Sequence, residues 1–489
     1  MTDAWHWKSA CEIRDAVQGG AVSATQVAED HLAHIDAVDG QVDAFTQVWR
    51  DKALEMAAAV DAKAARGEPL GPLAGVPVSL KELLCTRYGK TTCASKMLAG
   101  FESPYDATVV KKLEDADAVF LGKVNMDEFA MGSSTENSAL KTTKNPWDLT
   151  CVPGGSSGGS AASVAAGECA LSLGSDTGGS IRQPACLCGC VGLKPTYGRV
   201  SRFGLVAFAS SLDQIGPLTR TVEDAALALR VISGKDPMDA TSADMPAADV
   251  TDALTGDIAG LRVGLPREYF TDALNPEMRE KIEQAVDVYR AHGAEIVDIS
   301  LPCSNYAIAV YYIICTAEAS ANLARFDGVR YGFRHPDAKT VQDMYVLSKS
   351  EGFGPEVQRR IMLGTYVLSS GYYDAYYLKA QKARALIKKD FDAAFEQCDV
   401  IAGPTSPTAS FAFGAKSDNP LEMYLSDIYT ISVNLATLPG ISLPCGLTDA
   451  GLPAGLQLIA RPFEEATLLK AAHFYEANRG FDMGRPPIA

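Results

Sequence analysis

The sequence lacks a long hydrophobic run. The longest candidate, over 307–317, has about eleven residues and is followed by Glu318, whereas about 18 apolar residues are needed to cross a bilayer. We therefore expect a buried core element here and no association with a membrane. Residues 1–8 also lack the basic stretch and apolar segment of a secretory signal, so we expect a cytoplasmic protein.

Positive charge is also in short supply. Lys and Arg number 44 against 60 Asp and Glu, which gives a formal charge of −16. A chain this acidic is unsuited to gripping a phosphate backbone over a broad face, so any nucleic acid that it serves is expected to be held by a partner. The 47% hydrophobic and 21% charged content excludes a disordered chain, a collagen and a coiled coil.

Cysteines with the spacing of a metal site are missing. The twelve cysteines are scattered, and Cys186, Cys188 and Cys190 form C-x-C-x-C rather than the C-x-x-C of a zinc knuckle. In a chain of the cytosolic type we expect reduced, structural cysteines and no bound metal.

The pattern of apolar residues divides the chain into two parts. Residues 1–68 are expected to form a helical region packed on the core, with Ser23 and Gln26 as a capping box at the start of one helix. Residues 69–489 alternate short apolar strands with helices, which predicts a single α/β domain with a sheet covered on both faces. Within it, the acidic stretch 234–260 is expected to be a surface connection between two halves.

Two helices are expected in the second half of the chain. One runs from about Pro276 to His292, because Gly293 follows in a C-terminal cap position. The other runs over about 364–395. Tyr366, Tyr373 and Tyr377 fall on one face of it, which is typical of a core stripe.

The most informative stretch is rich in glycine and serine. It runs over 153–160 and resumes over 174–182, on either side of a predicted helix and strand. Because these glycines bracket ordered elements, we expect tight turns rather than a flexible linker.

Two familiar sites fit this stretch poorly. A phosphate-binding loop would need Lys and then Ser or Thr after Gly159, where Ser160 and Ala161 stand, so it would lack its positive charge. An α/β-hydrolase elbow around Ser157 would need a histidine base, but the chain has only six histidines and none lies in a motif-like context.

Serine catalysis without histidine fits better. A serine hydroxyl needs a base to become a nucleophile, and a neutral lysine can serve; the candidate is Lys81, at the end of a strand-like stretch. A free lysine ionises near ~10.4, so its pKa would have to fall by roughly three units, or about 4 kcal/mol, through burial and hydrogen bonds to hydroxyls. The candidates for an oxyanion hole are the successive amides of Thr177, Gly178, Gly179 and Ser180.

At these residues the sequence resembles the amidase signature family, over about residues 5–480. Lys81 lies 75 residues before Ser156, and Ser180 lies 24 residues after it, which fits that family's Ser-cis-Ser-Lys triad. The resemblance implies that Ser180 attacks the amide carbonyl and carries the acyl group, while Ser156, on a cis peptide, relays the proton to Lys81. It also implies that residues 69–489 form one amidase signature domain, a large mixed, twisted β-sheet of about eleven strands between layers of helices.

Within the family, the chain is most similar to the glutamine-hydrolysing subunits of glutamyl-tRNA(Gln)/aspartyl-tRNA(Asn) amidotransferases. The similarity implies a heterotrimer in which this chain hydrolyses glutamine and supplies ammonia to a partner, the B subunit, with a C subunit completing the complex. The B subunit would bind most of the tRNA and use ATP and Mg²⁺ to amidate it, so no cofactor is expected on this chain. The segments that carry the similarity are 122–137, 197–204, 211–217, 325–331, 359–365 and 370–376.

The expected substrate, glutamine, carries both a carboxylate and an ammonium group. A selective pocket therefore needs a cation and an anion, and arginine suits a carboxylate. The similarity implies that Arg360 holds the carboxylate and Asp427 the ammonium, with Tyr311 alongside. Other interpretations stay open: Arg359 could take the place of Arg360, Asp427 could cap a helix, and Tyr311 could be core.

One position departs from the pattern of these subunits. Lys81 is followed by Glu82 and Leu83, where they usually have Asp and Asn. The departure keeps open a second hypothesis, a stand-alone amidase of the same family acting on a small apolar or aryl amide. A third hypothesis is a catalytically silent scaffold protein, which the intact lysine and both serines disfavour.

Overall fold

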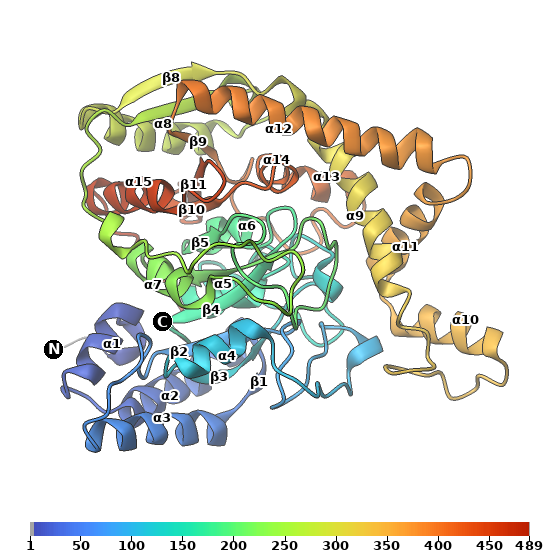
Figure 1. Ribbon diagram of the computed structural model, residues 1–489, viewed down its shortest axis with the longest axis horizontal. Coiled ribbons are helices and arrows are strands. Elements are labelled where there is room, and N and C mark those ends of the chain that lie inside the picture. Colours follow the sequence, from blue (N-terminus) through green and yellow to red (C-terminus); the bar gives the residue numbers. More distant parts are fainter. Residues whose placement is uncertain (1–3, 489) are drawn as a thin grey trace.

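Eleven strands form one mixed sheet in the computed structural model of this protein, which describes residues 4–488 (Figure 1). The strands are β1 (Phe45–Val48), β2 (Pro77–Lys81), β3 (Val119–Val124), β4 (Leu171–Asp176), β5 (Val191–Lys194), β6 (Gln214–Thr219), β7 (Arg262–Pro266), β8 (Glu295–Ile299), β9 (Val400–Pro404), β10 (Gly440–Leu447) and β11 (Pro453–Ala460). Their order across the sheet is β1-β3-β2-β4-β6-β5-β10-β11-β9-β7-β8. The expected fold class, with about eleven strands, is confirmed.

Helices cover both faces of the sheet (Figure 1). They are α1 (Ala10–Gln18), α2 (Ala24–Val42), α3 (Arg50–Ala65), α4 (Thr108–Asp115), α5 (Gly158–Ala165), α6 (Arg182–Cys188), α7 (Val222–Ile232), α8 (Pro276–Ala291), α9 (Ala307–Leu323), α10 (Val341–Gly352), α11 (Pro355–Val367), α12 (Lys379–Gln397), α13 (Pro420–Leu425), α14 (Ile431–Leu435) and α15 (Glu465–Asn478). On one face α15 packs against α7 and α8, and on the other lie α5, α6 and α14. Within residues 4–488, no helix is both long enough and apolar enough to cross a bilayer.

Three neighbouring parallel strands determine where the candidate site lies. β3 and β4 flank β2 and run parallel to it, and Lys81 at the end of β2 stands opposite Val124 at the end of β3. In sheets of this kind, functional residues gather beyond the carboxyl ends of the strands. The residues that follow β2, β3 and β4 in the sequence therefore meet in one place.

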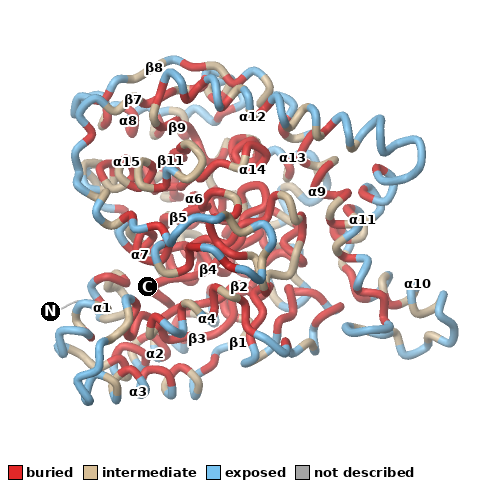
Figure 2. Tube along the Cα trace, in the orientation of Figure 1, coloured by how far each residue is buried: buried red, intermediate tan, exposed pale blue. Residues whose placement is uncertain are grey.

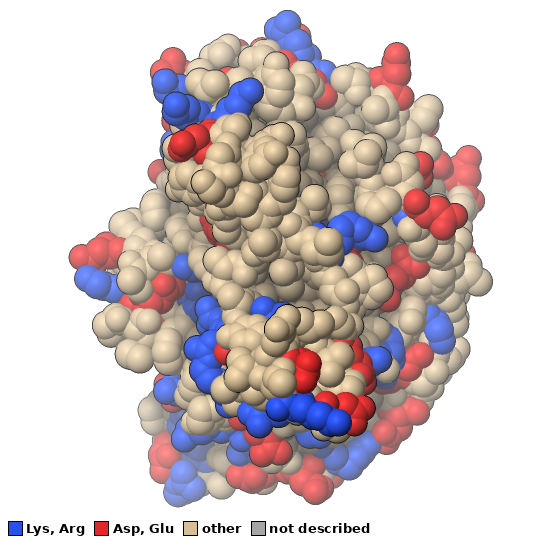
Figure 3. Space-filling view, turned by 90° about the vertical axis from the view of Figure 1, so that its right-hand side faces the viewer, with Lys and Arg blue, Asp and Glu red and all other residues tan. Residues whose placement is uncertain are grey.

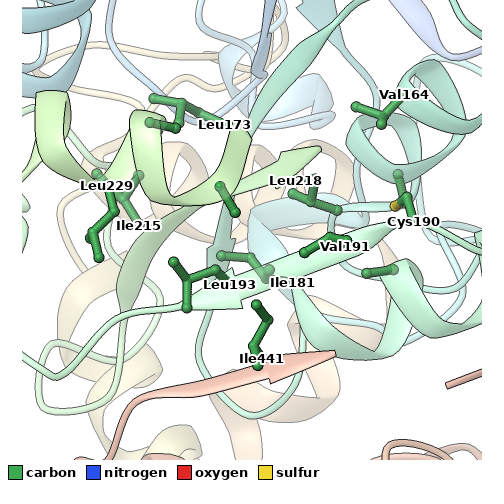
Figure 4. Packing of buried hydrophobic residues seen from close by; sticks show 14 of the residues in the cluster. Val164, Leu173, Ile181, Cys190, Val191, Leu193, Ile215, Leu218, Leu229 and Ile441 are labelled. Carbon is green, nitrogen blue, oxygen red and sulfur yellow. The ribbon is translucent and has the colours of Figure 1, made fainter. Parts of the chain in front are cut away.

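The core beneath this place is aliphatic. β4, β5 and β6 are buried along their whole length, in the red central part of Figure 2. Figure 4 shows Leu173, Val191, Leu193, Ile215 and Leu218 from these strands packed together with side chains of the adjoining helices. Strands covered on both faces have nearly continuous apolar sequences, which is the pattern that predicted them.

The N-terminal region contributes a strand as well as helices. Ser23 and Gln26 form the predicted capping box, and α2 continues to Val42. Asp43, in the left-handed conformation with φ 59°, ends this helix, and β1 then pairs antiparallel with β3. The expectation for 1–68 missed β1 because four residues are too few to show an alternating pattern. The region is therefore an edge of the main sheet.

The long helix expected over 364–395 is interrupted. α11 ends at Val367, Gly371 adopts φ +85°, and a π-helical segment (η7, Tyr373–Leu378) leads into α12. The helix is capped at Leu368, and the left-handed Gly371 lies in the turn that follows, a break that the apolar periodicity alone did not reveal. Tyr366 and Tyr373 are 49% and 41% exposed, so the interpretation as a core stripe is wrong.

The connection 234–260 has little regular structure apart from a short 3₁₀ turn at Thr251–Ala253. Asp236 accepts hydrogen bonds from the hydroxyls of Thr108 at 2.6 Å and Ser201 at 2.5 Å. Asp239 accepts the backbone N–H of Arg202 at 2.8 Å. Some of the acidic residues thus fasten the connection to the domain instead of only facing solvent.

We expect Gly364→Ala to lower the free energy of unfolding by roughly 1–3 kcal/mol, because its Cβ would overlap the carbonyl oxygen of Thr316 where α11 meets α9. Gly40→Ala is the matched control. Gly40 is exposed in α2 with no atom within 4 Å of an added Cβ, so alanine there should raise stability by about 0.5–1 kcal/mol. Urea denaturation followed by circular dichroism measures both. Equal stability of Gly364→Ala and wild type would show that this close approach is not needed.

Candidate active site

Lys81 lies at the centre of a cluster of serine hydroxyls. Its side chain is fully buried, and its Nζ is hydrogen bonded to the Oγ atoms of Ser157 at 2.7 Å, Ser156 at 2.8 Å and Ser175 at 2.9 Å. Burial lowers the pKa of Lys81 from an ordinary value of 10.5 to about 7, against the opposing charges of Asp127 and Asp176. An amine with this pKa can be neutral near pH 7 and accept a proton from a hydroxyl.

Ser156 lies directly beside Lys81, with its Oγ 2.8 Å from the amine nitrogen. The peptide bond between Gly155 and Ser156 is cis, as the family resemblance implied. The backbone N–H of Asp127 donates to the carbonyl oxygen of Ser156 at 3.2 Å. Glycine is required at the neighbouring Gly159, since a Cβ there would overlap the backbone of Asn125. The turn is therefore held tightly against the segment that follows β3.

Ser180 lies next to this turn and is the accessible serine of the three predicted residues. The backbone N–H of Ser157 donates to the carbonyl oxygen of Ser180 at 3.2 Å. Ser180 is partly exposed, whereas Lys81 and Ser156 are fully buried. The structure thus brings the three residues into one site, and Ser180 is the one of them that is open to solvent.

The predicted oxyanion loop is built differently at one of its four residues. Asp176 accepts the backbone N–H of Gly179 at 2.8 Å, so this amide is committed inside the loop and is not a free donor for a substrate oxygen. Thr430 Oγ1 donates to the carbonyl oxygen of Gly178 at 2.6 Å and fixes the loop from the other side. Of the four predicted amides, those of Thr177, Gly178 and Ser180 therefore stay candidate donors.

A buried ion pair anchors the loop, and the sequence analysis did not identify it. Arg182 donates from Nε and Nη2 to Asp176, each at 3.0 Å, and both residues are fully buried. The same guanidinium also donates to Gln457 and Asn434, at 2.7 and 2.5 Å. The signal was available, because Asp176 and Arg182 are the charged residues within the otherwise neutral stretch 174–182.

Arg360 is the buried member of the Arg359–Arg360 pair. It lies on the inner face of α11, donates to Glu356 at 2.7 Å, and is covered by the rings of Tyr312 and Tyr424 at 5.3 and 5.4 Å. Its Nη2 atom has no hydrogen-bond partner among the described residues. Arg359 is exposed and pairs with Glu356 from the outside. A ligand in the interior would therefore meet Arg360.

Asp427 and Tyr311 lie directly against the oxyanion loop. An added Cβ on Gly178 would meet the ring of Tyr311 at 2.7 Å, and one on Gly179 would meet Asp427 Oδ1 at 3.0 Å. The hydroxyl of Ser133 donates to the other oxygen of Asp427, and sequence reasoning gave no sign of that contact. Oδ1 has no partner among the described residues, and burial raises the pKa of Asp427 to about 7. An unpaired oxygen of Asp427 thus lies beside the loop, and Arg360, with an unpaired nitrogen, lies beyond Tyr311 and Tyr312.

Comparison with known proteins gives the family. The family model described as Amidase matches residues 26–469. The chain belongs to the amidase family. The A subunit of the glutamyl-tRNA(Gln) amidotransferase of Carboxydothermus hydrogenoformans is 58% identical over 483 residues, which cover 99% of each chain. The corresponding A subunit of Anaeromyxobacter dehalogenans is 59% identical over 470 residues, or 96% of each chain.

Solved structures of amidases superpose on nearly the whole of this chain. The A subunit of the glutamyl-tRNA(Gln) amidotransferase from Thermotoga maritima superposes with a TM-score of 0.82 at 40% identity and covers 99% of both chains. A bacterial aryl acylamidase of the amidase signature family superposes with a TM-score of 0.85 at 25% identity, over 98% of this chain and 100% of that one.

Glu82, the residue that departs from the pattern of the amidotransferases, serves the structure of this amidase. Its carboxylate is fully buried and accepts hydrogen bonds from Gln47 Nε2 at 2.7 Å and from the backbone and hydroxyl of Thr92 at 3.0 and 2.9 Å. Thr46 donates to it as well. Glu82 therefore ties β1 to the loop after β2, and its side chain is committed away from the serine cluster.

The three clustered cysteines lie in the packed interior of the protein. Cys186, Cys188 and Cys190 are buried free thiols, and the Cys188 thiol donates to the carbonyl oxygen of Pro153 at 3.2 Å. Over residues 4–488, no group of three or more His, Cys, Asp or Glu side chains could hold a metal ion.

A cavity of ≈ 220 Å³ between α11 and α13 is lined by Arg360, Glu356 and Tyr424, among others.

We expect labelling of Ser180 by a fluorophosphonate to rise with pH through about 7, because only neutral Lys81 can accept the proton of the serine relay. Below that value the neutral fraction, and with it the labelling rate, should fall about tenfold per pH unit. Mass spectrometry of labelled protein between about pH 5 and about pH 9 measures the rate. Lys81→Arg, a permanent cation, is the control and should stay unlabelled. A flat profile in the wild type would exclude the amine as the base.

Proposed function

We propose that this amidase is the glutamine-hydrolysing subunit of an aminoacyl-tRNA amidotransferase. The observation that carries the proposal is a pair of unsatisfied buried atoms: Asp427 Oδ1, beside the Ser180 loop, and Arg360 Nη2, which is separated from the loop by Tyr312 and Tyr311. A site for a neutral apolar amide has no use for an unpaired guanidinium nitrogen and an unpaired carboxylate oxygen, whose burial is costly. Glutamine offers a partner to each, and the relatives at 55–59% identity carry the name of the amidotransferase A subunit.

The geometry supports a two-step hydrolysis. Neutral Lys81 takes a proton from Ser156, which takes one from Ser180, while Ser180 Oγ attacks the carboxamide carbon. The amides of Thr177, Gly178 and Ser180 are the candidates to hold the oxyanion of the tetrahedral intermediate. As the intermediate collapses, the C–N bond breaks and the relay returns the proton, so ammonia leaves and a glutamyl ester remains on Ser180. Water then attacks this ester through the same relay, which releases glutamate.

The substrate groups fit the charges around the loop. The substrate carboxylate would accept a hydrogen bond from Arg360 Nη2. The Nε atom of the same guanidinium already donates to Glu356 at 2.7 Å, so the guanidinium is oriented before the ligand arrives. The ammonium would donate to Asp427 Oδ1 beside Tyr311. A neighbouring cation favours the ionised carboxylate, so bound substrate would keep Asp427 charged although burial alone raises its pKa to about 7.

The proposal includes partners. Ammonia would pass to a B subunit that holds most of the tRNA and uses ATP and Mg²⁺, with a C subunit completing a heterotrimer. The formal charge of −16 supports this division, because the glutaminase chain offers little to a phosphate backbone. A cytoplasmic location is part of the proposal, in keeping with the free thiols of all twelve cysteines.

One face of the molecule is suited to such a partner. More than half of the exposed large apolar side chains in the described residues lie within 341–386, and they include Met362 at 72% exposed, Leu363, Tyr366, Tyr372 and Tyr376. This stretch lies on the side that Figure 3 turns toward the viewer, where large areas carry no charged atoms. Exposed aromatic and methionine side chains with few charges are typical of protein interfaces. α11 presents this surface on its outside and Arg360 on its inside, so a partner bound here would contact the helix that holds the substrate.

Arg360→Ala should lower kcat/KM for glutamine by about 10- to 100-fold, because a charge-assisted hydrogen bond to the substrate is lost. Arg359→Ala, one residue away and exposed, is the matched control and should change it less than about twofold, because exposed ion pairs contribute little. Ammonia release from glutamine measures both, with Ser180→Ala as the inactive reference. If Arg360→Ala hydrolyses glutamine normally and wild type turns over an aryl amide better, a stand-alone amidase is the better interpretation.

The double variant Met362→Asp/Tyr366→Asp should abolish co-purification with the B and C subunits, since two buried charges without partners oppose association. It should also remove glutamine-dependent amidation of Glu-tRNA(Gln) while glutamine hydrolysis by the isolated chain continues. Met238→Asp, which changes an exposed apolar residue of the 234–260 connection, is the control and should assemble normally. Normal assembly of the double variant would exclude this face.

A further inference from the structure

Asp127 carries a carboxylate that the mechanism described so far does not use. It lies three residues after β3 and is fully buried. Its Oδ1 accepts the backbone N–H of Asn137 at 3.2 Å, and its Oδ2 has no hydrogen-bond partner among the described residues. A Cβ on Gly132 or Gly155 would overlap this carboxyl group. Two glycines thus let the carboxylate reach the backbone on which Ser156 is built.

The other buried acids near Lys81 are already compensated. Asp176 is paired with Arg182 at 3.0 Å. Asp213 accepts the hydroxyl of Thr177 at 2.7 Å and the backbone N–H groups of Phe208 and Ala209. Asp127 is the one of the three acids with an unpaired oxygen. No described carboxylate comes within ion-pair distance of Lys81, so a positive charge there would act on its neighbours through space.

Asp127 is also joined to the relay through Ser156. Its backbone N–H donates to the carbonyl oxygen of Ser156 at 3.2 Å, and the hydroxyl of Ser156 meets Lys81 at 2.8 Å. Because β2 and β3 are adjacent and parallel, Lys81 and Asp127 arrive at the same end of the sheet from neighbouring strands. The carboxylate and the amine therefore belong to one rigid unit.

We propose that Asp127 is a positioning residue of the relay, whose carboxylate compensates the charge on Lys81 whenever the lysine holds the transferred proton. The inference rests on the proposed function only in its use of the Lys81–Ser156–Ser180 relay, and not on glutamine or on a partner. It goes beyond the three predicted residues, because it assigns a role to a fourth residue that touches neither the substrate nor the nucleophile.

The proton count is consistent with this role. The hydroxyl of Ser157 donates to the carbonyl oxygen of Ser175 at 3.1 Å, so Ser157 can only accept from Lys81. In the proposed relay the proton that reaches Lys81 comes from Ser156, whose Oγ lies 2.8 Å from the amine. That proton turns the amine into an ammonium as the oxyanion forms. No bond to Asp127 is made or broken. The carboxylate stays ionised and lowers the cost of a buried ammonium, and the proton later leaves with ammonia.

The pKa values agree with a mutual dependence. Burial raises the pKa of Asp127 to about 6, and the rise is opposed first by the backbone N–H groups of Thr135 and Asn137 and then by the charge of Lys81. For Lys81, burial lowers the pKa to about 7, and Asp127 is the first of the charges that oppose the fall. Each group therefore helps the other to stay charged inside the protein.

The test is the pH profile of Ser180 labelling by a fluorophosphonate in Asp127→Asn, which needs neither glutamine nor a partner. Without the carboxylate, the ammonium form of Lys81 is less stable, so the rising limb should move to lower pH by about one unit while the plateau rate falls at least about tenfold. Glu128→Gln is the matched control. Glu128 is the next residue, is also buried with a pKa raised to about 7, and accepts from Ser95 and from the Gly354 N–H at 2.8 Å instead of facing the relay. Its profile should match the wild type.

The proposal would be overturned if Asp127→Asn lowered the plateau labelling rate without moving the rising limb of the pH profile. It would also be overturned if Glu128→Gln moved that limb by the same amount. If Asp127→Asn does not fold, the double variant Lys81→Met/Asp127→Asn tests the proposal instead. Because it removes the amine along with the carboxylate, it should fold. Failure of the double variant to fold would count against compensation. A wild type that labels and responds as described but does not hydrolyse glutamine would refute the proposed function and leave the role of Asp127 standing.

Discussion

The site depends on keeping one primary amine, that of Lys81, inside the protein without a carboxylate bound to it. Lowering its pKa from 10.5 to about 7 corresponds to about 5 kcal/mol of differential stabilisation between its two protonation states. Three hydroxyls, from Ser156, Ser157 and Ser175, satisfy the hydrogen bonds of the amine without adding charge. A carboxylate in direct contact would hold the proton too firmly, so neutral oxygen atoms are the partners that leave the amine able to act as a base.

This requirement explains the composition of the two glycine-serine turns. Hydroxyls supply the hydrogen bonds, and glycines let two backbones approach until those hydroxyls can reach one nitrogen atom. Gly159 packs on the backbone of Asn125, and Gly179 packs against Thr430 and Asp427, so larger residues would open the site. What composition alone would suggest to be a flexible linker is therefore a tightly packed part of the molecule.

The sequence predicted the elements whose signals are local. The strand ending at Lys81 and the capping box of α2 depend on residues close together in the chain, whereas the triad followed from the family resemblance. It did not predict β1, which is too short to show a period, or the break at Gly371. In the candidate site it missed Asp127, Ser133 and Thr430, because each acts on a segment more than twenty residues away that only the fold brings near. It also gave Gly179 a donor role, although Asp176 binds that amide.

The anchoring of the Ser180 loop has a consequence for the order of events during synthesis. Arg182 is held by Asn434 and Gln457, and the loop itself by Thr430, so the segments that stiffen it leave the ribosome some 250 residues after the serine does. A nascent chain that already contains every reactive group therefore lacks these contacts until residues 430–457 have emerged. The order of synthesis thus separates the appearance of the reactive groups from the stiffening of the loop that carries Ser180.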